Sequence, residues 1–218
     1  MRDFGVTGDR VRRIEGVFSG TLSFLFSEFA PPPFCTSSNP IHSVSVPGVK
    51  WSEIVKKARE RGYTQPDPRD DLNGLDVARK VTILARLAGL SIDSPGSFPV
   101  QSLIPKELEG VGSVEEFMAR LSDYDGRMDE ARDRAVKAGK LLRYVGRVDI
   151  VRRKAEVGLE WFEPDDPIAR LDGRENIISF YTKRYGDDPL TIRGAGAGGS
   201  VAAMGVTADM LRILDQLG

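Results

Sequence analysis

The sequence predicts an α+β fold, with helices in the first half, a mixed and mostly antiparallel sheet in the second half, and a C-terminal helix. Apolar residues recur at helical spacing over 51–90 and 114–138, alternate with polar residues over 142–183, and return to helical spacing over 201–217. Helices and strands that are segregated along a chain favour α+β over alternating α/β units. We therefore expect one α+β domain over residues 1–218.

The composition excludes several classes of function. The 218 residues are 40% hydrophobic and 29% charged, as in an ordinary globular protein with a substantial core. A net charge of −1 provides no basic field for nucleic acid and no polybasic patch for a membrane surface. No apolar run approaches a membrane span, and Met1–Gly5 does not resemble a signal peptide. We expect a cytoplasmic protein without nucleic-acid or membrane partners.

Cysteine and histidine are too scarce to carry the chemistry. The single cysteine, Cys35, excludes an internal disulfide, and the single histidine, His42, leaves little for a metal site or a histidine-based triad. Both lie in a Pro- and Ser-rich stretch, residues 30–50, which has no period and is interpreted as a surface loop or disordered insertion. We expect no metal site and assign neither residue a catalytic role. Acid–base chemistry must come from Asp, Glu, Lys or Tyr.

The first elements are a strand and a short helix. Residues 9–18 alternate well enough to form a strand, and Ser19-Gly20-Thr21 then opens an apolar helix that ends near Phe29. Ser19 or Thr21 is the expected N-cap. Gly20 and Thr21 could also hydrogen-bond a small polar ligand at the helix N-terminus, although capping is the commoner use.

A rigid turn between two helices follows. The stripe that buries the first of these helices consists of Trp51, Ile54, Val55 and Ala58. Gly62 is a natural stop for that helix, and Pro66 and Pro68 restrict the backbone of the turn. Asp70 or Asp71 is then expected to cap the second helix, because a carboxylate can accept from the first free N–H groups.

Two charges on the second helix, which is expected to run to about Leu90, are placed unusually. At about 100° per residue, Asp76 and Lys80 fall within its apolar arc. That arc consists of Leu72, Val77, Ile83, Leu84 and Leu87. The opposite, solvent-facing side is expected to consist of Arg79, Thr82 and Arg86. As an exposed ion pair the two charges would contribute roughly 0.2–0.5 kcal/mol. On a packed face they must be paired or line a cavity, where a desolvated lysine is readily tuned for proton transfer. The angular placement of Asp76 and Lys80 on the predicted helix favours the interpretation that they lie on its packed face.

The second half switches from helices to strands. Residues 113–116 form a Ser-Val-Glu-Glu capping box, and a more charged helix follows over 125–138. Alternation over 142–150 and 155–161 predicts an antiparallel hairpin. The remaining expected elements are strands over 176–183 and 190–193 and a helix over 201–217.

A glycine-rich turn joins the last strand to the last helix. Residues 194–199 satisfy G-x-G-x-x-G, but no second parallel strand can follow before Gly218, so a complete dinucleotide fold is not expected here. The turn could let a cofactor approach the backbone, or its glycines could serve a tight packed corner, and the two readings are equally favoured.

Three stretches of the chain resemble homoserine dehydrogenases. Residues 58–80 match the family signature A-x3-G-aromatic-small-x2-D-P-x2-D-L-x-G-x-D-x3-K at every fixed position. Residues 14–23 and the 194–199 turn are also similar to the family. The resemblance covers nearly the whole chain except 30–50, and is closest to the fungal, single-function form.

The resemblance implies an activity and a set of site residues. The family reduces L-aspartate 4-semialdehyde to L-homoserine with NADPH or NADH, on the route to threonine, methionine and isoleucine, and a homodimer is expected. Lys80 is implied as the proton donor to the carbonyl oxygen. Implied substrate-binding residues are Gln65, Asp71, Asp76, Gly20, Thr21 and Tyr63, and implied cofactor-binding residues are Gly62 and Gly198.

The chain also departs from the family. A nucleotide-binding Rossmann domain is expected before Asp3 and is absent, so we expect a substrate-binding and dimerisation half that is inactive by itself. Gln65 stands where the family has a glutamate, which weakens a charge-assisted contact to a neutral one. Ala202 replaces the usual threonine. The alternative hypothesis is a non-catalytic relative that serves as a dimerisation or small-molecule-binding module.

Overall fold

The fold is described here from a computed structural model, which covers residues 2–32, 49–196 and 198–217. Its α-helices are α1 (Arg2–Val6), α2 (Gly20–Phe29), α3 (Trp51–Glu60), α4 (Arg69–Leu72), α5 (Leu75–Leu87), α6 (Val114–Arg120), α7 (Asp125–Lys137) and α8 (Gly199–Leu217). Two 3₁₀ helices are η1 (Lys106–Leu108) and η2 (Leu121–Tyr124). The strands are β1 (Val11–Val17), β2 (Leu141–Asp149), β3 (Lys154–Phe162), β4 (Glu175–Thr182) and β5 (Leu190–Ala195).

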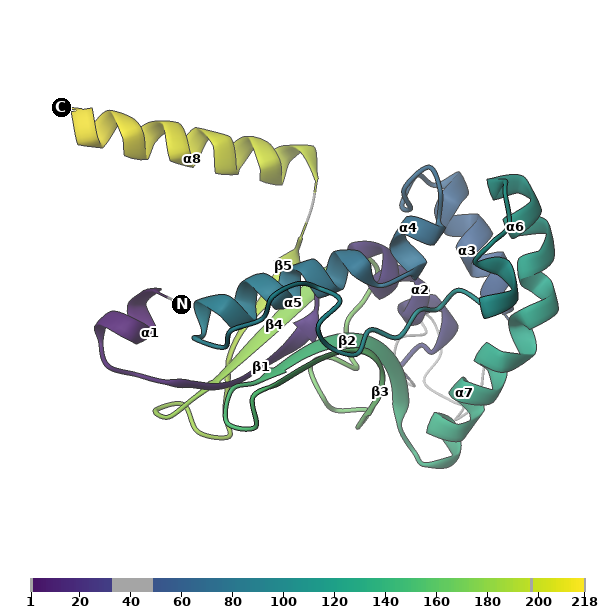
Figure 1. Ribbon diagram of the computed structural model, residues 1–218, viewed down its shortest axis with the longest axis horizontal. Coiled ribbons are helices and arrows are strands. Elements are labelled where there is room, and N and C mark those ends of the chain that lie inside the picture. The colour runs from purple at the N-terminus through teal and green to yellow at the C-terminus, as the bar shows by residue number, and fades with distance from the viewer. Residues whose placement is uncertain (1, 33–48, 197, 218) are drawn as a thin grey trace, which may run out of the picture.

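The five strands form one sheet in the order β3-β2-β1-β4-β5 (Figure 1). All neighbouring strands are antiparallel, and β1 is central although it comes first in the chain. Ile14 of β1 lies opposite Val148 of β2 on one side and Phe180 of β4 on the other. One isolated parallel bridge joins Val100 to Val157. The expected α+β class, the β2–β3 hairpin and the C-terminal helix are therefore confirmed.

The two faces of the sheet carry two apolar clusters, because successive strand residues point to opposite sides. Ile14, Tyr144 and Val148 belong to the larger cluster, which packs beneath the helical layer. The smaller cluster consists of Val17, Leu141, Val145, Phe162, Ile168, Ala169, Leu171 and Ile177. The larger cluster also contains all four residues of the stripe expected on α3, each with no more than 1% of its surface exposed.

Helix ends follow several of the local signals. The Ser19 hydroxyl accepts a hydrogen bond from the Leu22 N–H at 3.2 Å, so Ser19 is the N-cap of α2. The Ser113 hydroxyl accepts from the Glu116 N–H at 3.1 Å, which confirms half of the capping box. Gly62 follows α3 with φ of +65°, the left-handed conformation of a helix stop.

The turn after α3 differs from the expectation in how the next helix starts. Neither Asp70 nor Asp71 caps it: both lie inside the one-turn helix α4, whose N-cap is Pro68. α5 begins separately at Leu75, after Gly74 with φ of +75°, and it ends at Leu87 rather than near residue 90. The left-handed residue rotates the chain between the two helices, so Leu72 does not share a helical wheel with α5.

The packed face expected on α5 is correct at Val77 and partly at Leu84, but wrong at Ile83, Leu87 and Thr82. Its buried residues are Val77, Ala78, Val81, Thr82 and Ala85. Ile83 and Leu87 are 57% and 63% exposed, whereas Thr82, expected on the wet side, is 4% exposed and donates to the Ala78 carbonyl. Lys80 and Asp76 lie beside the buried stripe rather than within it, with 44% and 51% of their side chains exposed. Lys80 is not desolvated.

The C-terminal helix α8 extends from the end of β5, away from the sheet (Figure 1). None of its described side chains is buried. Among the described residues, no helix combines the length and apolar character needed to cross a membrane. Residues 33–48, with Cys35 and His42, lie outside the part of the chain described, as does most of the stretch interpreted as an insertion.

Candidate functional site

Lys80 is fixed by two hydrogen bonds at the junction of α5 and β1. Its ammonium lies 2.8 Å from Oδ2 of Asp76, one turn earlier on α5, and 2.8 Å from the carbonyl oxygen of Phe18, directly after β1. An ammonium has three N–H donors, so one is left for a ligand. The half-exposed ion pair adds little to stability, but the carbonyl holds the amine in one place. Lys80 can therefore present a proton to a bound oxygen atom.

The turn that follows α3 is attached to the start of α2. The Thr21 hydroxyl donates to the Tyr63 carbonyl oxygen at 2.6 Å, across 42 residues of sequence. The Tyr63 ring packs edge-on against Phe24 of α2, with 5.0 Å between centroids. Ser19 caps α2, so the Thr21 side chain is available for this long-range contact. The turn and the N-terminus of α2 form one wall of the site.

Asp71 lies behind that wall, partly buried. Its Oδ2 accepts a hydrogen bond from the Gln65 N–H at 2.7 Å, and the Thr21 hydroxyl is close enough to affect its ionisation. Burial raises the pKa of Asp71 above its usual value, the hydrogen bond from Gln65 opposes that rise, and the charge of Asp76 adds to it. Asp71 and Asp76 thus belong to one electrostatic neighbourhood.

The structure brings together most of the residues singled out from the sequence. Contacts connect Thr21 to Tyr63 and Asp71, Gln65 to Asp71, and Asp76 to Lys80. Gly20 adjoins Thr21, and Gly62 adjoins Tyr63. The Gln65 side chain is exposed and makes no hydrogen bond or ion pair within the described ranges.

Gly198 is not brought into this cluster. A Cβ built on it would meet no described atom within 4 Å, so its φ of +146°, rather than packing, accounts for glycine there. Gly196 differs, because a Cβ would stand 2.0 Å from the Asn176 side-chain nitrogen. Within the turn, Gly196 therefore serves a packed corner, whereas Gly194, Gly198 and Gly199 have open space at their Cβ positions.

Sequence reasoning missed two features beside the site. One is the Phe18 carbonyl, since a backbone acceptor leaves no residue-type signal. The other is a cavity of about 200 Å³ lined by Gly20, Arg174, Glu175 and Ala195. Arg174 lies over the Tyr63 ring, with its guanidinium carbon 4.6 Å from the centroid. An arginine in the loop before a strand is common, so only the fold could reveal it.

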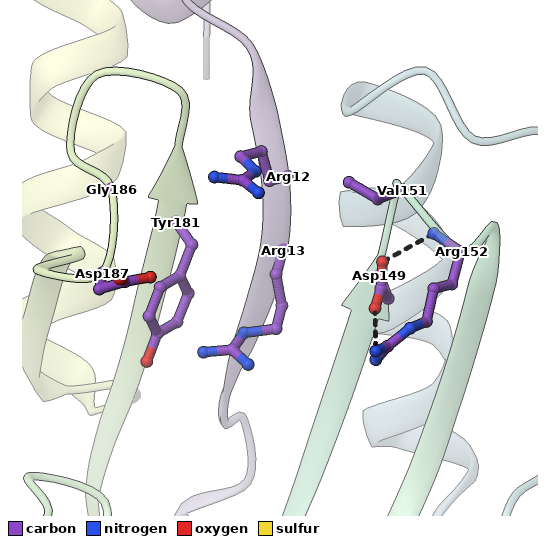
Figure 2. A pocket seen from close by; sticks show the side chains of 8 residues that line it. All are labelled: Arg12, Arg13, Asp149, Val151, Arg152, Tyr181, Gly186 and Asp187. Atoms are coloured by element: carbon purple, nitrogen blue, oxygen red, sulfur yellow. Dashed lines mark hydrogen bonds and ion pairs between the residues drawn. The ribbon is translucent and has the colours of Figure 1, made fainter.

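A second cavity, of about 240 Å³, lies at the far end of the sheet (Figure 2). A bulge in β1 between Val11 and Arg13 places Arg12 and Arg13 along the same cavity, and the Arg13 guanidinium stacks 3.9 Å above Tyr181. Arg152, also on its wall, is bonded to Asp149. The lining of this second cavity contains none of the residues singled out from the sequence.

Comparisons with known sequences agree on one family. A sequence profile described as homoserine dehydrogenase matches residues 1–211. The homoserine dehydrogenase of Paracoccidioides brasiliensis is 58% identical over 217 residues, and that of Saccharomyces cerevisiae is 48% identical over 217 residues. The alignments cover 100% of this chain but 56% and 57% of those relatives, so the chain spans little more than half their length.

Solved structures agree on the fold. A protein of unknown function from Candida auris superposes with a TM-score of 0.86 and 45% identity, covering 98% of this chain and 56% of that chain. A homoserine dehydrogenase from Thiobacillus denitrificans superposes with a TM-score of 0.66 and 24% identity, over 94% of this chain and 39% of that chain. At that identity the second comparison shows the fold alone.

Proposed function

The chain belongs to the homoserine dehydrogenase family, and from that premise we propose that it is the substrate half of an enzyme that reduces L-aspartate 4-semialdehyde to L-homoserine with NADPH or NADH. The observation that supports this most directly is the Lys80 ammonium, held by Asp76 and the Phe18 carbonyl with one donor left over. We place the reaction on the route to threonine, methionine and isoleucine. A cytoplasmic homodimer is part of the same proposal.

The proposed chemistry needs a hydride and a proton. A nicotinamide cofactor, when bound, would supply the hydride to the aldehyde carbon. Lys80 donates its free N–H to the aldehyde oxygen, neutralises the charge that develops there, and delivers the proton. Asp76 holds Lys80 on one side and can take the substrate ammonium on the other. Neither group requires burial for this role, since the Phe18 carbonyl fixes the amine.

The remaining residues shape the substrate pocket. We assign the floor to Gly20 and Thr21, one wall to the backbone of Tyr63 and the side chain of Gln65, and the rear to Asp71. The Thr21 hydroxyl, which donates to the Tyr63 carbonyl, keeps the turn at a fixed distance from α2. A neutral Gln65 would accept a hydrogen bond from the substrate ammonium more weakly than a carboxylate does.

The described residues fit only part of a dinucleotide. At Gly62 and Gly198 a Cβ would meet nothing within 4 Å, so a ligand can approach either backbone. The cavity beside Gly20, about 200 Å³, is smaller than the roughly 300–1,000 Å³ of typical ligand pockets. We therefore propose that Gly62 and Gly198 contact the nicotinamide end, and that a nucleotide-binding segment outside residues 1–218 holds the rest.

A non-catalytic relative is the second candidate. The feature that favours it is Gln65, exposed in the turn without a carboxylate. On this view the domain binds a small molecule or mediates dimerisation, and Lys80 and Asp76 are only a surface ion pair.

One assay separates the two functions. NADPH oxidation with L-aspartate 4-semialdehyde is followed for the chain alone and for the chain joined behind the N-terminal segment of the Paracoccidioides brasiliensis relative. We expect activity in the joined protein, its loss in Lys80→Ala, and its retention in Lys140→Ala. Lys140 is a matched control, because it forms a comparable half-exposed pair with Glu163 at 3.1 Å. A folded joined protein without activity would favour the non-catalytic relative.

A further inference from the structure

We propose that Arg174 binds the α-carboxylate of the amino-acid substrate. This inference rests on the proposed function and adds a residue that the sequence analysis did not single out. Arg174 directly precedes β4, in the loop that ends beside the N-terminus of α2. Its role would be positioning the substrate, since it contacts the end of the molecule that does not react.

The position of Arg174 is defined by two residues of the candidate substrate pocket. Its guanidinium carbon lies 4.6 Å from the centroid of the Tyr63 ring. A Cβ on Gly20 would stand 3.3 Å from the Arg174 carbonyl oxygen and 3.8 Å from its Nε. The side chain therefore runs past Gly20 and ends over Tyr63, along the wall of the 200 Å³ cavity. A larger residue at position 20 would push it away.

Arg174 is electrostatically available. Its neighbour Glu175 is paired with Arg193, whose Nη2 and Nε lie 2.5 and 3.1 Å from Glu175 Oε2. Within residues 2–32, 49–196 and 198–217, Arg174 forms no ion pair or hydrogen bond through its side chain, and its guanidinium stacks on the Tyr63 ring. Stacking on an aromatic face leaves the edge of the guanidinium free, and that edge matches a carboxylate in a two-point contact.

A cation at this place would complement the charges of the substrate. L-Homoserine carries one ammonium and one carboxylate, and the pocket already holds the carboxylates of Asp71 and Asp76. Lys80 is engaged by Asp76 and directed at the reacting oxygen, so it does not serve the α-carboxylate as well. Arg174, which lies beside Gly20, is then the cation left to bind the α-carboxylate. The phosphates of the cofactor are the other anion that could reach it, and the experiment distinguishes the two.

The test is an NMR titration of the 218-residue chain with L-homoserine and with L-homoserinamide, which lacks the negative charge. The wild-type chain is expected to bind L-homoserine about tenfold or more tightly than the amide, as a charge-assisted contact allows. In Arg174→Gln the preference should fall to near one, with affinity for the amide unchanged. Arg174→Lys should keep part of the preference. Because both ligands meet the same folded protein, a change in fold cannot mimic this result.

Arg61→Gln is the matched control. Arg61 also stacks on the aromatic pair, 5.8 Å from the Phe24 centroid, but it is exposed and does not line the cavity. It should keep the full preference. A preference that survives in Arg174→Gln overturns the inference and leaves the proposed function standing. NADP⁺ affinity is measured in the joined protein: its loss in Arg174→Gln, with L-homoserine binding intact, assigns the residue to the cofactor and also overturns the inference. A wild-type chain that binds neither ligand contradicts the inference, whereas the proposed function is judged separately by the activity of the joined protein.

Discussion

The hydroxyl of Tyr144 lies 2.0 Å from the point where a side chain on Gly74 would begin. Gly74 has φ of +75° and immediately precedes α5, which carries Asp76 and Lys80. The same hydroxyl donates to the Gln101 carbonyl oxygen at 2.6 Å, and burial raises the pKa of Tyr144, so it stays a donor. This contact sets where α5 starts over β2.

Gly74→Ala should destabilise the fold by about 2 kcal/mol or more, because it adds a left-handed backbone penalty to a steric clash. Gly62→Ala is the matched control, since Gly62 has φ of +65° but no atom within 4 Å of its Cβ position. It should lose only about 1 kcal/mol. Urea unfolding measures both. In the Tyr144→Phe background the cost of Gly74→Ala should fall, and equal costs in both backgrounds would remove Tyr144 from the explanation.

Lys80→Arg should abolish most of the catalysis while keeping the fold. Arginine keeps the positive charge beside Asp76 but does not release a proton near neutral pH. In the joined protein we expect kcat for NADPH oxidation to fall about 10²-fold or more, the range lost with a general acid. The midpoint of thermal unfolding should hardly change, because the pair is half exposed. An arginine variant with full activity would show that charge alone, and not proton transfer, is what the site needs.

Asp71 should make the protein less stable as pH rises. Burial raises the pKa of Asp71 in the folded state above the ordinary value of 3.8, which applies to the unfolded state. At a pH between the unfolded-state pKa and the folded-state pKa, the folded state therefore binds more protons than the unfolded state. The free energy of unfolding therefore falls as pH increases through that window, and the loss persists above it. Asp71→Asn keeps an acceptor for the Gln65 N–H and removes the titration.

Urea unfolding of both proteins, from about pH 3.5 to about pH 7, isolates this group, because other carboxylates cancel in the difference. The stability of Asp71→Asn relative to wild type should increase with pH across the window. A difference that is flat, or that declines with pH, would contradict the burial assigned to Asp71.

Arg143 should be among the most sensitive positions for stability. It is 2% exposed and donates to the carbonyl oxygens of Ala30 and Leu142 at 2.8 Å, and also to that of Ala169. Truncation to alanine leaves buried acceptors without a donor, so Arg143→Ala should cost about 3 kcal/mol or more. Arg152→Ala is the control, because that side chain is 79% exposed and should change stability by less than about 0.5 kcal/mol. Chemical denaturation compares the two, and similar costs would refute the burial argument.

Local patterns predicted most of the fold. The alternation in β2 and β3, the Ser19 cap and the stripe of α3 each depend on neighbours a few residues apart, and all are found in the structure. The face of α5 was predicted wrongly for a specific reason. The wheel followed the larger apolar residues, and two of these, Ile83 and Leu87, are exposed in the structure. The side of α5 that packs is made of smaller residues: Val77, Ala78, Val81, Thr82 and Ala85.

The candidate site was predictable to the extent that it lies in one continuous stretch. The resemblance over residues 58–80 singled out Tyr63, Asp71 and Lys80, and the structure places all three near α2. The Phe18 carbonyl and Arg174 were missed, because each reaches the site through tertiary contacts between distant segments. Burial of Lys80 was expected and is not found, because its side chain lies beside the buried residues of α5 and is 44% exposed.

The central place of β1 has a consequence for the order in which the protein assembles. Ile14 must find Val148 and Phe180, partners more than a hundred residues away in sequence, before the sheet is continuous. During synthesis β1 therefore emerges early and waits, with both hydrogen-bonding edges open, until β2 and β4 have left the ribosome. Such non-local pairing is slow and exposes strand edges that can associate between chains. The strand order thus delays the pairing of β1, whatever the stability of the finished fold.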